Sequence, residues 1–358
     1  MSEIAKTKII AEIGVNHNGS LDLAKKLIDA AIASGADVVK FQAFKASRLV
    51  TRHAPKAAYQ QTKDDSQFAM LKRLELAESD YSAIMDYCRE KSIEILFSIF
   101  DVESLDFLVD NFDVKKVKLG SGEITNAPLL LAIAQRRCDV IVSTGMSALL
   151  EIENALSVLA FGYLNLHVQP SMRAFKKAYQ TAQVKALLKQ KVMLLHCNSA
   201  YPTPLEDVNL RVMDVMHKEF GLMVGYSDHT VGISAAIAAV ARGAQVIEKH
   251  FTLDKTMSGP DHKVSSEPGE FSSMVTAIRE VEKMLGDANK QITASEKENV
   301  TIVRKSIVAL KLIRKGDVFS SENLTIKRPG VGVSPFHFWD LLGSRADRAY
   351  QPEEEIVL

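Results

Sequence analysis

The stretch LMVGYSDH, residues 222–229, is an apolar run that ends in a serine, an aspartate and a histidine. Continuous runs of Val, Ile and Leu are typical of strands buried on both faces, whereas strands with one wet face alternate apolar and polar residues. The polar residues therefore stand at the carboxyl end of a predicted buried strand. Whether this pattern recurs along the chain decides the fold.

The pattern recurs in seven other segments, each of which also ends in polar or glycine-rich sequence. They are KIIAEIG from Lys8, DVVKFQ from Asp37, IEILFS from Ile93, KKVKLGSGE from Lys115, DVIVSTG from Asp139, VMLLHCNS from Val192 and QVIEKHF from Gln245. Segments with helical spacing lie between them, as in SLDLAKKLIDAAIASG, where Ser20 is the expected N-cap and Gly35 the stop. Eight strands that alternate with helices predict an α/β fold of the (β/α)8 TIM-barrel type. A doubly wound open sheet is the alternative, because periodicity does not show closure.

Two intervals are longer than one helix requires. Residues 48–70 follow the second strand and residues 162–183 follow the fifth, and both are rich in Lys, Gln and Tyr. We predict loops or extra helices there, and the first interval is a candidate substrate lid. Farther on, the polar run GDANKQITASEKENV precedes a region of short alternating strands with turn signals. The expected organisation is a barrel domain over residues 1–285, a linker over 286–300 and a small β-rich domain over 301–358.

Composition excludes several classes of protein. The 358 residues include 44 basic and 44 acidic side chains, so the formal net charge is zero and no block of like charge forms a tail. Bulk attraction to nucleic acid or to an anionic membrane is therefore not indicated. The three cysteines have no CxxC spacing, the first residues MSEIAKTKIIAEIG lack a basic segment followed by a long apolar one, and no run of about 18 apolar residues occurs. We expect a cytoplasmic protein.

In a barrel of this type, the catalytic side chains lie at the carboxyl ends of the strands. Every predicted strand contributes polar residues at that end, namely Glu12, Lys40, Gln42, Ser98, Lys118, Ser121, Glu123, Ser143, Thr144, Ser199, Ser227, Asp228, His229, Glu248 and His250. Burying one unpaired polar group costs about 1 to 3 kcal/mol, so eight such strand ends are difficult to explain as packing alone. We predict an active site at this rim.

The residue types point to an anionic ligand. Lys40 and Lys118 supply positive charge, and several serines supply hydroxyl donors, a combination that suits a phosphate group. Neither a Walker motif nor a GxGxxG motif occurs, which argues against a nucleotide. Asp261, in the short loop segment GPDHKVS, is a candidate for contact with the hydroxyls of a polyol.

The two histidines are candidate metal ligands. His229 and His250 end neighbouring strands, so together with oxygen ligands and water they can hold a divalent ion with open positions, such as Mn²⁺ or Mg²⁺. The alternative is a pair of hydrogen-bonded rim histidines. A Ser-His-Asp triad within SDH is disfavoured because adjacent strand residues point to opposite faces. For the same reason we expect Asp228 to orient or cap rather than to react.

One polar cluster has a structural interpretation. In TPLEDVNL, Thr203 as N-cap, Pro204 at the first helical position and Glu206 two residues later predict a capping box at the start of a helix.

The ordered motifs resemble those of the sialic acid synthase family. They are AEIGVNHNGS, VKFQ, KLGSGEITN, STGM, HCNSAYPTP, GYSDHT, VIEKHFTLD and GPDHKVS, while KRPGVGVSP and GSRADR resemble the antifreeze-like (SAF) domain of that family. The resemblance covers essentially the whole chain. It implies a C–C bond-forming transferase that condenses phosphoenolpyruvate with an N-acylated hexosamine aldehyde, giving a nine-carbon 2-keto acid and phosphate by C–O cleavage.

The resemblance also implies roles for individual residues. Phosphoenolpyruvate would be held by Lys40, Ser98, Lys118, Ser121, Ser143, Ser199 and Ser227. His229 and His250 would ligate a divalent metal, with Mn²⁺ expected ahead of Mg²⁺ or Co²⁺, and Gln42, Glu123, Tyr201 and Asp261 would face the sugar. Glu12 would lie near the reacting centre, and Glu12 or Glu123 would be the catalytic acid or base. In a domain-swapped homodimer, Arg328 would reach the N-acyl group from the partner chain.

The motifs do not determine which sugar is the substrate. FSIFD stands where many relatives have STPFD, Ser199 stands where some have Asn, and the interval from Gly162 to Lys191 is closer to that of members making legionaminic-type sugars. We expect N-acetylmannosamine and an N-acetylneuraminate-type product, with 2,4-diacetamido-2,4,6-trideoxymannose and legionaminic acid as the alternative. More distant alternatives are a Schiff-base aldolase that uses Lys40 or Lys118 and a non-catalytic sugar-binding protein.

Overall fold

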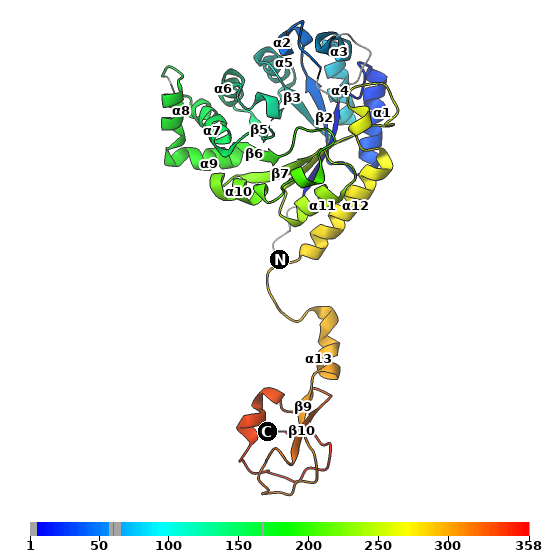
Figure 1. Cartoon of the computed structure of the whole chain (residues 1–358), viewed down its shortest axis with the longest axis vertical. Helices are drawn as coiled ribbons and strands as arrows, with labels where there is room; N and C mark the ends of the chain where they lie inside the picture. Colours follow the sequence, from blue (N-terminus) through cyan, green and yellow to red (C-terminus); the bar gives the residue numbers. More distant parts are fainter. Residues whose placement is uncertain (1–5, 57–59, 61–65, 167, 358) are drawn as a thin grey trace. The chain divides into compact units, whose positions relative to one another are not determined.

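The computed structural model describes residues 6–56, 60, 66–166 and 168–357. Eight parallel strands form a closed barrel in sequence order, with β1 paired to β8 (Figure 1). The strands are β1 Lys8–Gly14, β2 Val38–Ala43, β3 Glu94–Ile99, β4 Lys116–Leu119, β5 Asp139–Ser143, β6 Val192–His196, β7 Met223–Asp228 and β8 Val246–His250. Each of the eight predicted strands is confirmed, and closure of the sheet excludes the open alternative.

Helices surround the barrel. They are α1 Leu21–Ala33, α2 Ala46–Leu49, α3 Gln67–Leu74, α4 Glu78–Glu90, α5 Val102–Phe112, α6 Ala127–Gln135, α7 Leu149–Tyr163, α8 Met172–Tyr179, α9 Ala182–Lys191, α10 Val212–Phe220, α11 Ser234–Ala241 and α12 Pro268–Leu285. Ser20 caps α1 by accepting a hydrogen bond from the Leu23 N–H, as predicted. Extra helices occur at both long intervals: α2 and α3 follow β2, and α8 and α9 follow α7. Residues 57–59 and 61–65 of the predicted substrate lid lie outside the described residues.

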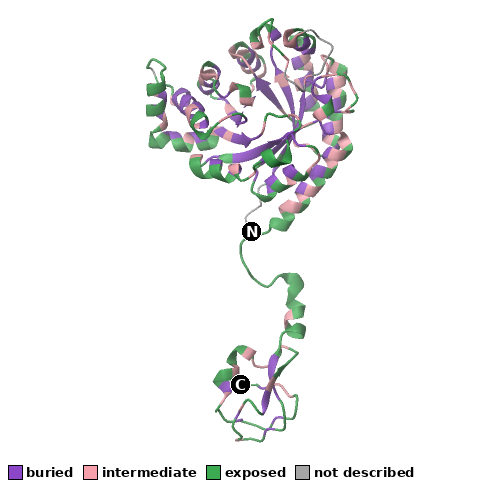
Figure 2. Cartoon of the chain, in the orientation of Figure 1, coloured by how far each residue is buried: buried purple, intermediate pink, exposed green. Residues whose placement is uncertain are grey.

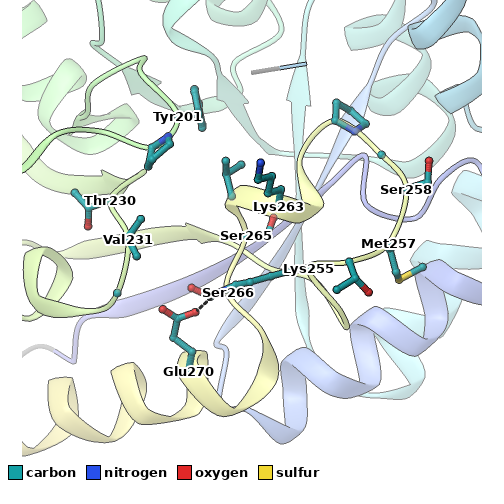
Figure 3. A pocket seen from close by; sticks show the side chains of 16 residues that line it. Tyr201, Thr230, Val231, Lys255, Met257, Ser258, Lys263, Ser265, Ser266 and Glu270 are labelled. Carbon is teal, nitrogen blue, oxygen red and sulfur yellow. Dashed lines mark hydrogen bonds and ion pairs between the residues drawn. The ribbon is translucent and has the colours of Figure 1, made fainter. Parts of the chain in front are cut away.

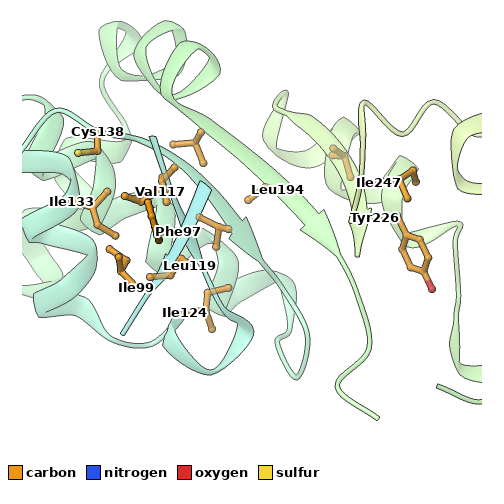
Figure 4. Packing of buried hydrophobic residues seen from close by; sticks show 14 of the residues in the cluster. Phe97, Ile99, Val117, Leu119, Ile124, Ile133, Cys138, Leu194, Tyr226 and Ile247 are labelled. Carbon is orange, nitrogen blue, oxygen red and sulfur yellow. The ribbon is translucent and has the colours of Figure 1, made fainter. Parts of the chain in front are cut away.

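Two apolar regions hold the barrel together. Outward-facing strand residues such as Phe97, Val117, Leu194 and Ile247 pack against the helices in one large cluster (Figure 4). Burial is nearly complete along the strands, while the helices expose their outer faces (Figure 2). Inside the barrel a second, smaller cluster forms a layer. Its buried members are Ile10, Val38, Leu96, Ile141, Leu195 and Val246.

This inner layer places the site. Strand residues two positions apart point to the same side, so the inward residue after each layer member lies nearer the mouth of the barrel. These next residues include Glu12, Lys40, Ser98, Ser143 and Glu248. In β7 the layer position is Gly225, where a Cβ would lie 2.7 Å from the Leu195 side chain and 2.5 Å from a backbone oxygen of β8. The apolar layer therefore forms a floor, and polar residues stand directly above it.

The predicted capping box at Thr203 is wrong. Residues Leu205–Asp207 form a single 3₁₀ turn preceded by Pro204, and α10 begins only at Val212. Thr203 is instead tied to the rim, because its N–H donates to the His229 carbonyl at 2.9 Å and its hydroxyl donates to the Ala200 carbonyl. One long-range and one local hydrogen bond therefore engage Thr203 in place of the predicted cap.

The chain separates into two compact units, Met1–Gly286 and Asp287–Leu358. The second contains α13 Lys297–Val303, an antiparallel pair formed by β9 Ser306–Ala309 and β10 Leu324–Lys327, and the short helix α14 Phe338–Leu341. A separate apolar cluster, which includes Ile307, Phe319 and Tyr350, forms its core. Within the described ranges, none of the helices combines the length and the apolar character that crossing a bilayer requires.

Candidate active site

A cavity of about 490 Å³ opens above the apolar floor of the barrel. Fourteen of the fifteen sequence-predicted site residues line it: Glu12, Lys40, Gln42, Ser98, Lys118, Ser121, Glu123, Ser143, Ser199, Tyr201, Ser227, His229, His250 and Asp261. Arg328 belongs to the second unit, where it is exposed directly after β10. The barrel thus brings together side chains that are far apart in the sequence.

The two lysines are buried and already paired. Lys40 Nζ lies 2.6 Å from Glu248 Oε2 and 3.3 Å from Glu12 Oε2, while Lys118 Nζ lies 3.7 Å from Glu248 Oε1. Lys118 also donates to Ser143 Oγ at 2.7 Å. All four charged side chains are at most 6 % exposed. An anionic ligand would therefore enter a preformed charge cluster and compete with carboxylates for the ammonium groups.

The two carboxyl groups of this cluster differ in acidity. Burial raises the pKa of Glu12 to about 7, although Lys40 partly opposes this shift. Burial alone would also raise the pKa of Glu248, but Lys118 and Lys40 outweigh it and hold that pKa below its usual range. Near neutral pH, Glu248 is ionised and Glu12 exists in both forms. Glu12 is therefore poised to exchange a proton with a ligand.

Burial lowers the pKa of Lys118, and the neighbouring Lys40 adds to the effect. For Lys40 the attraction of Glu12 and Glu248 outweighs burial and raises the pKa. Lys40 is thus the more firmly held positive charge of the pair.

The histidines at the ends of β7 and β8 lie side by side, with ring centroids 5.6 Å apart. His229 Nδ1 lies 2.6 Å from the Asn198 carbonyl oxygen, which can only accept, so the proton is on Nδ1. Its Nε2 therefore carries a lone pair and accepts from the Tyr201 hydroxyl at 3.1 Å. Ser227 Oγ lies 3.3 Å from the same nitrogen but donates its proton to Glu248 Oε1 at 2.8 Å. Burial lowers the pKa of His229 to about 4 and that of His250 well below its usual range, so both rings are neutral.

These features fit a metal site with two protein ligands. Neutral imidazoles supply lone pairs, and a backbone partner fixes the ring of His229. Among the residues that the structure describes, His250 Nδ1 is buried without a hydrogen-bond partner. In the same described part of the chain, no group of three or more His, Cys, Asp and Glu side chains is arranged around one point. The remaining positions of a bound ion would then be filled by water and substrate.

Asp228 has the orienting position expected from strand alternation. It points away from the cavity and pairs with Lys249 of β8 at 2.7 Å, with both side chains at most 4 % exposed. Asp228 Oδ1 also accepts from the N–H and the hydroxyl of Thr230. These contacts fix the residues directly before and after His229, and so they orient the turn that carries it.

The sugar-facing candidates lie nearer the mouth of the cavity. Burial raises the pKa of Asp261 to about 6, and burial also raises the pKa of Glu123, whose carboxylate accepts from Asn126 Nδ2 at 2.8 Å. Gln42 donates to Glu12 Oε1 at 3.3 Å. Ser121 accepts from the Gly145 N–H at 3.0 Å.

Sequence reasoning missed several lining residues. The sequence showed Glu248 as a polar residue at a strand end but assigned it no role. Because it lies two residues before His250 in the same strand, both side chains are expected to point inward. The β2–β3 region adds Leu49, Val50, Gln60, Gln67, Leu71 and Phe100. These residues follow the strands at irregular distances, so strand periodicity could not find them.

A larger, open groove of about 720 Å³ lies next to the cavity and shares Tyr201 with it. The loops after β7 and β8 supply most of its lining, which includes the ion pair between Lys255 and Glu270 (Figure 3). It contains neither the lysine–carboxylate cluster nor the two histidines. The chemistry therefore belongs to the smaller cavity.

Comparisons with known proteins identify relatives over most of the chain. The model of the NeuB family matches residues 27–290. The N,N'-diacetyllegionaminic acid synthase of Campylobacter jejuni is 46% identical over 98% of this chain and 99% of its own length. The enzyme of the same name from Legionella pneumophila is 42% identical over 94% of this chain and 89% of its own length. The crystal structure of an N-acetylneuraminic acid synthetase from Leptospira borgpetersenii has a TM-score of 0.67 at 31% identity and covers 83% of this chain and 91% of its own.

Proposed function

This chain belongs to the NeuB family, and we propose that its barrel condenses phosphoenolpyruvate with an N-acylated hexosamine and water. The observation that carries the proposal is the cluster of Lys40 and Lys118 beside two neutral histidines in one buried cavity. The lysines provide the charge that a phosphate needs, and the histidines fit a divalent ion. The named synthases among the relatives support this function over the aldolase and over the non-catalytic binding protein.

We propose 2,4-diacetamido-2,4,6-trideoxymannose as the sugar and a legionaminic-type acid as the product. The two relatives named above as N,N'-diacetyllegionaminic acid synthases are 46% and 42% identical, against 31% for the N-acetylneuraminic acid synthetase. The comparisons therefore favour this sugar over N-acetylmannosamine, the first expectation from sequence.

The proposed mechanism starts with phosphate held by Lys40, Lys118 and the serines around them. A divalent metal on His229 and His250, with Mn²⁺ the leading candidate, would supply a Lewis acid for the aldehyde oxygen. C3 of phosphoenolpyruvate attacks the aldehyde carbon, and the aldehyde oxygen takes up a proton. Water then adds to C2 and loses a proton, and the C2–O bond to phosphate breaks as the keto group forms. Glu12, with its pKa near 7, is the proposed proton carrier.

Arg328 of the second unit is a candidate contact for the sugar. We propose that this unit is the SAF domain of a domain-swapped homodimer and that Arg328 contacts the N-acyl group bound in the partner's barrel. Large exposed apolar side chains in the same unit support an interaction surface there: Val331 is 60 %, Phe336 91 % and Trp339 75 % exposed.

A phosphate-release assay with the two sugars in parallel tests the proposed substrate. With phosphoenolpyruvate and Mn²⁺, we expect kcat/KM for 2,4-diacetamido-2,4,6-trideoxymannose to exceed that for N-acetylmannosamine by at least about 10-fold, since pockets shaped for one substituent discriminate on that scale. A preference for N-acetylmannosamine would reassign the sugar. Absence of phosphate release with either sugar would contradict the condensation itself.

A further inference from the structure

One wall of the active-site cavity is apolar. Leu49 of α2, Val50 after it, Leu71 of α3 and Phe100 after β3 line the cavity together. The other walls carry mainly carboxyl, hydroxyl, amide and imidazole groups. Because an apolar wall cannot satisfy hydroxyl groups of a substrate, this side of the cavity is suited to a different part of the ligand than the rest.

The wall is the edge of a packed core rather than a set of loose side chains. Leu71 is only 7 % exposed and belongs to a buried cluster with Val15, Phe44, Ala46, Met70 and Leu74. Leu49, Val50 and Phe100 pack against this cluster, and the rings of Phe44 and Phe100 meet edge to face at 6.1 Å. The wall is therefore preorganised before a substrate binds.

Its position corresponds to the far end of the sugar. In a closed ring of eight strands, β3 stands opposite β7, which ends at the turn with His229. The wall residues come after β2 and β3, so they lie nearer the mouth than Lys40 within β2. The aldehyde carbon has to react near the histidines and the lysines, so the sugar carbons farthest from it extend toward the mouth. None of the four wall side chains carries a polar atom, while Gln60 and Gln67 of the same region line the cavity beside them.

We propose that this wall, formed by Leu49, Val50, Leu71 and Phe100, is the subsite for the C6 methyl group of a 6-deoxy sugar and determines the choice of substrate. The inference rests on the proposed function and adds the residues that contact the substituent at C6. A C6 hydroxyl at this position would lose its hydrogen bonds to water without replacement, whereas a methyl group gains contact. Since an apolar pocket rejects a hydroxylated analogue by no more than about 10²-fold, we expect discrimination of about 10- to 100-fold.

A matched pair of sugars isolates the C6 position. N-acetylmannosamine and 2-acetamido-2,6-dideoxymannose differ only in the C6 oxygen, and the wild-type protein should favour the 6-deoxy sugar in kcat/KM. Val50→Thr and Phe100→Tyr each add a hydroxyl at nearly constant volume, so each should bring the ratio toward one. Val109→Thr is the control, because Val109 is a partly buried valine on the outer helix α5. This variant should keep the wild-type ratio.

The outcomes separate the two levels of the proposal. If the wild-type protein releases phosphate but does not distinguish the paired sugars, or if both wall variants keep the wild-type ratio, the wall does not read C6 and the proposed condensation still stands. If the wild-type protein releases no phosphate with either of the paired sugars or with 2,4-diacetamido-2,4,6-trideoxymannose, the proposed function fails, and the subsite fails with it. A ratio that falls in both wall variants, but not in Val109→Thr, supports the subsite.

Discussion

Lys40→Met is expected to remove nearly all turnover and to destabilise the barrel at the same time. Lys40 is 3 % exposed and pairs with both Glu248 and Glu12, so the substitution leaves buried carboxylates without their main counter-charge. Breaking a buried ion pair from one side costs about 3 to 5 kcal/mol in the free energy of unfolding. Loss of one preorganised charge contact to the reacting group lowers kcat by about 10²- to 10³-fold.

A double variant separates the two effects. In Lys40→Met/Glu12→Gln the carboxylate that pairs only with Lys40 is also removed, while Glu248 keeps Lys118 as its partner, so part of the lost stability should return while turnover stays low. Lys191→Met is the matched control, because its pair with Asp139 is half-exposed at 30 % and 39 % and should change stability by about 1 kcal/mol or less. Urea unfolding and phosphate release measure the two quantities. A single variant with wild-type kcat/KM would contradict the phosphate role of Lys40.

His229→Gln is the second substitution with a large expected effect. His229 Nε2 accepts from the Tyr201 hydroxyl, and the His250 ring lies 5.6 Å from the His229 ring between centroids. No other pair of imidazoles lines the cavity in the described part of the chain. Loss of a residue that only hydrogen bonds to a metal ligand lowers metal affinity by roughly 10- to 100-fold. Loss of the ligand itself should weaken Mn²⁺ binding by at least that factor. Turnover should fall with it, as it should in wild-type protein treated with a chelator, where added Mn²⁺ should restore it.

Metal binding by equilibrium dialysis checks this independently of turnover. His196→Gln is the control: His196 is a buried histidine at the end of β6 that hydrogen bonds to the Val208 carbonyl, and it does not line the cavity. It should bind Mn²⁺ as the wild type does. If His229→Gln bound Mn²⁺ with unchanged affinity, or if chelated protein retained full turnover, the two histidines would not be the ligands.

The sequence predicted the barrel and most of the cavity lining for one physical reason. Side chains alternate along a strand, so an apolar floor residue such as Val246 implies that Glu248 and His250 point inward above it. The same parity predicted that Asp228 points outward. Its partner Lys249 could have been found by the same reasoning, since the two residues are register neighbours on the outer face.

Other features depend on contacts that a linear pattern does not contain. Lys40 and Lys118 form ion pairs with Glu248, which lies on a different strand, so these contacts depend on the distances between strands in the folded barrel. The Thr203 N–H donates to the distant His229 carbonyl, and no helix begins directly after Thr203. The apolar wall combines residues of α2 and α3 with residues that follow α2 and β3, and this grouping exists only after the chain has folded.

The fate of the bridging oxygen of phosphoenolpyruvate tests the proposed chemistry most directly. With ¹⁸O at the C2–O–P position and 2,4-diacetamido-2,4,6-trideoxymannose as acceptor, C–O cleavage transfers the label to inorganic phosphate. Mass spectrometry should therefore find labelled phosphate and one unlabelled nine-carbon 2-keto acid for each phosphate released. Label retained in the keto acid, or phosphate released without that acid, would contradict condensation by attack of C3 and addition of water at C2.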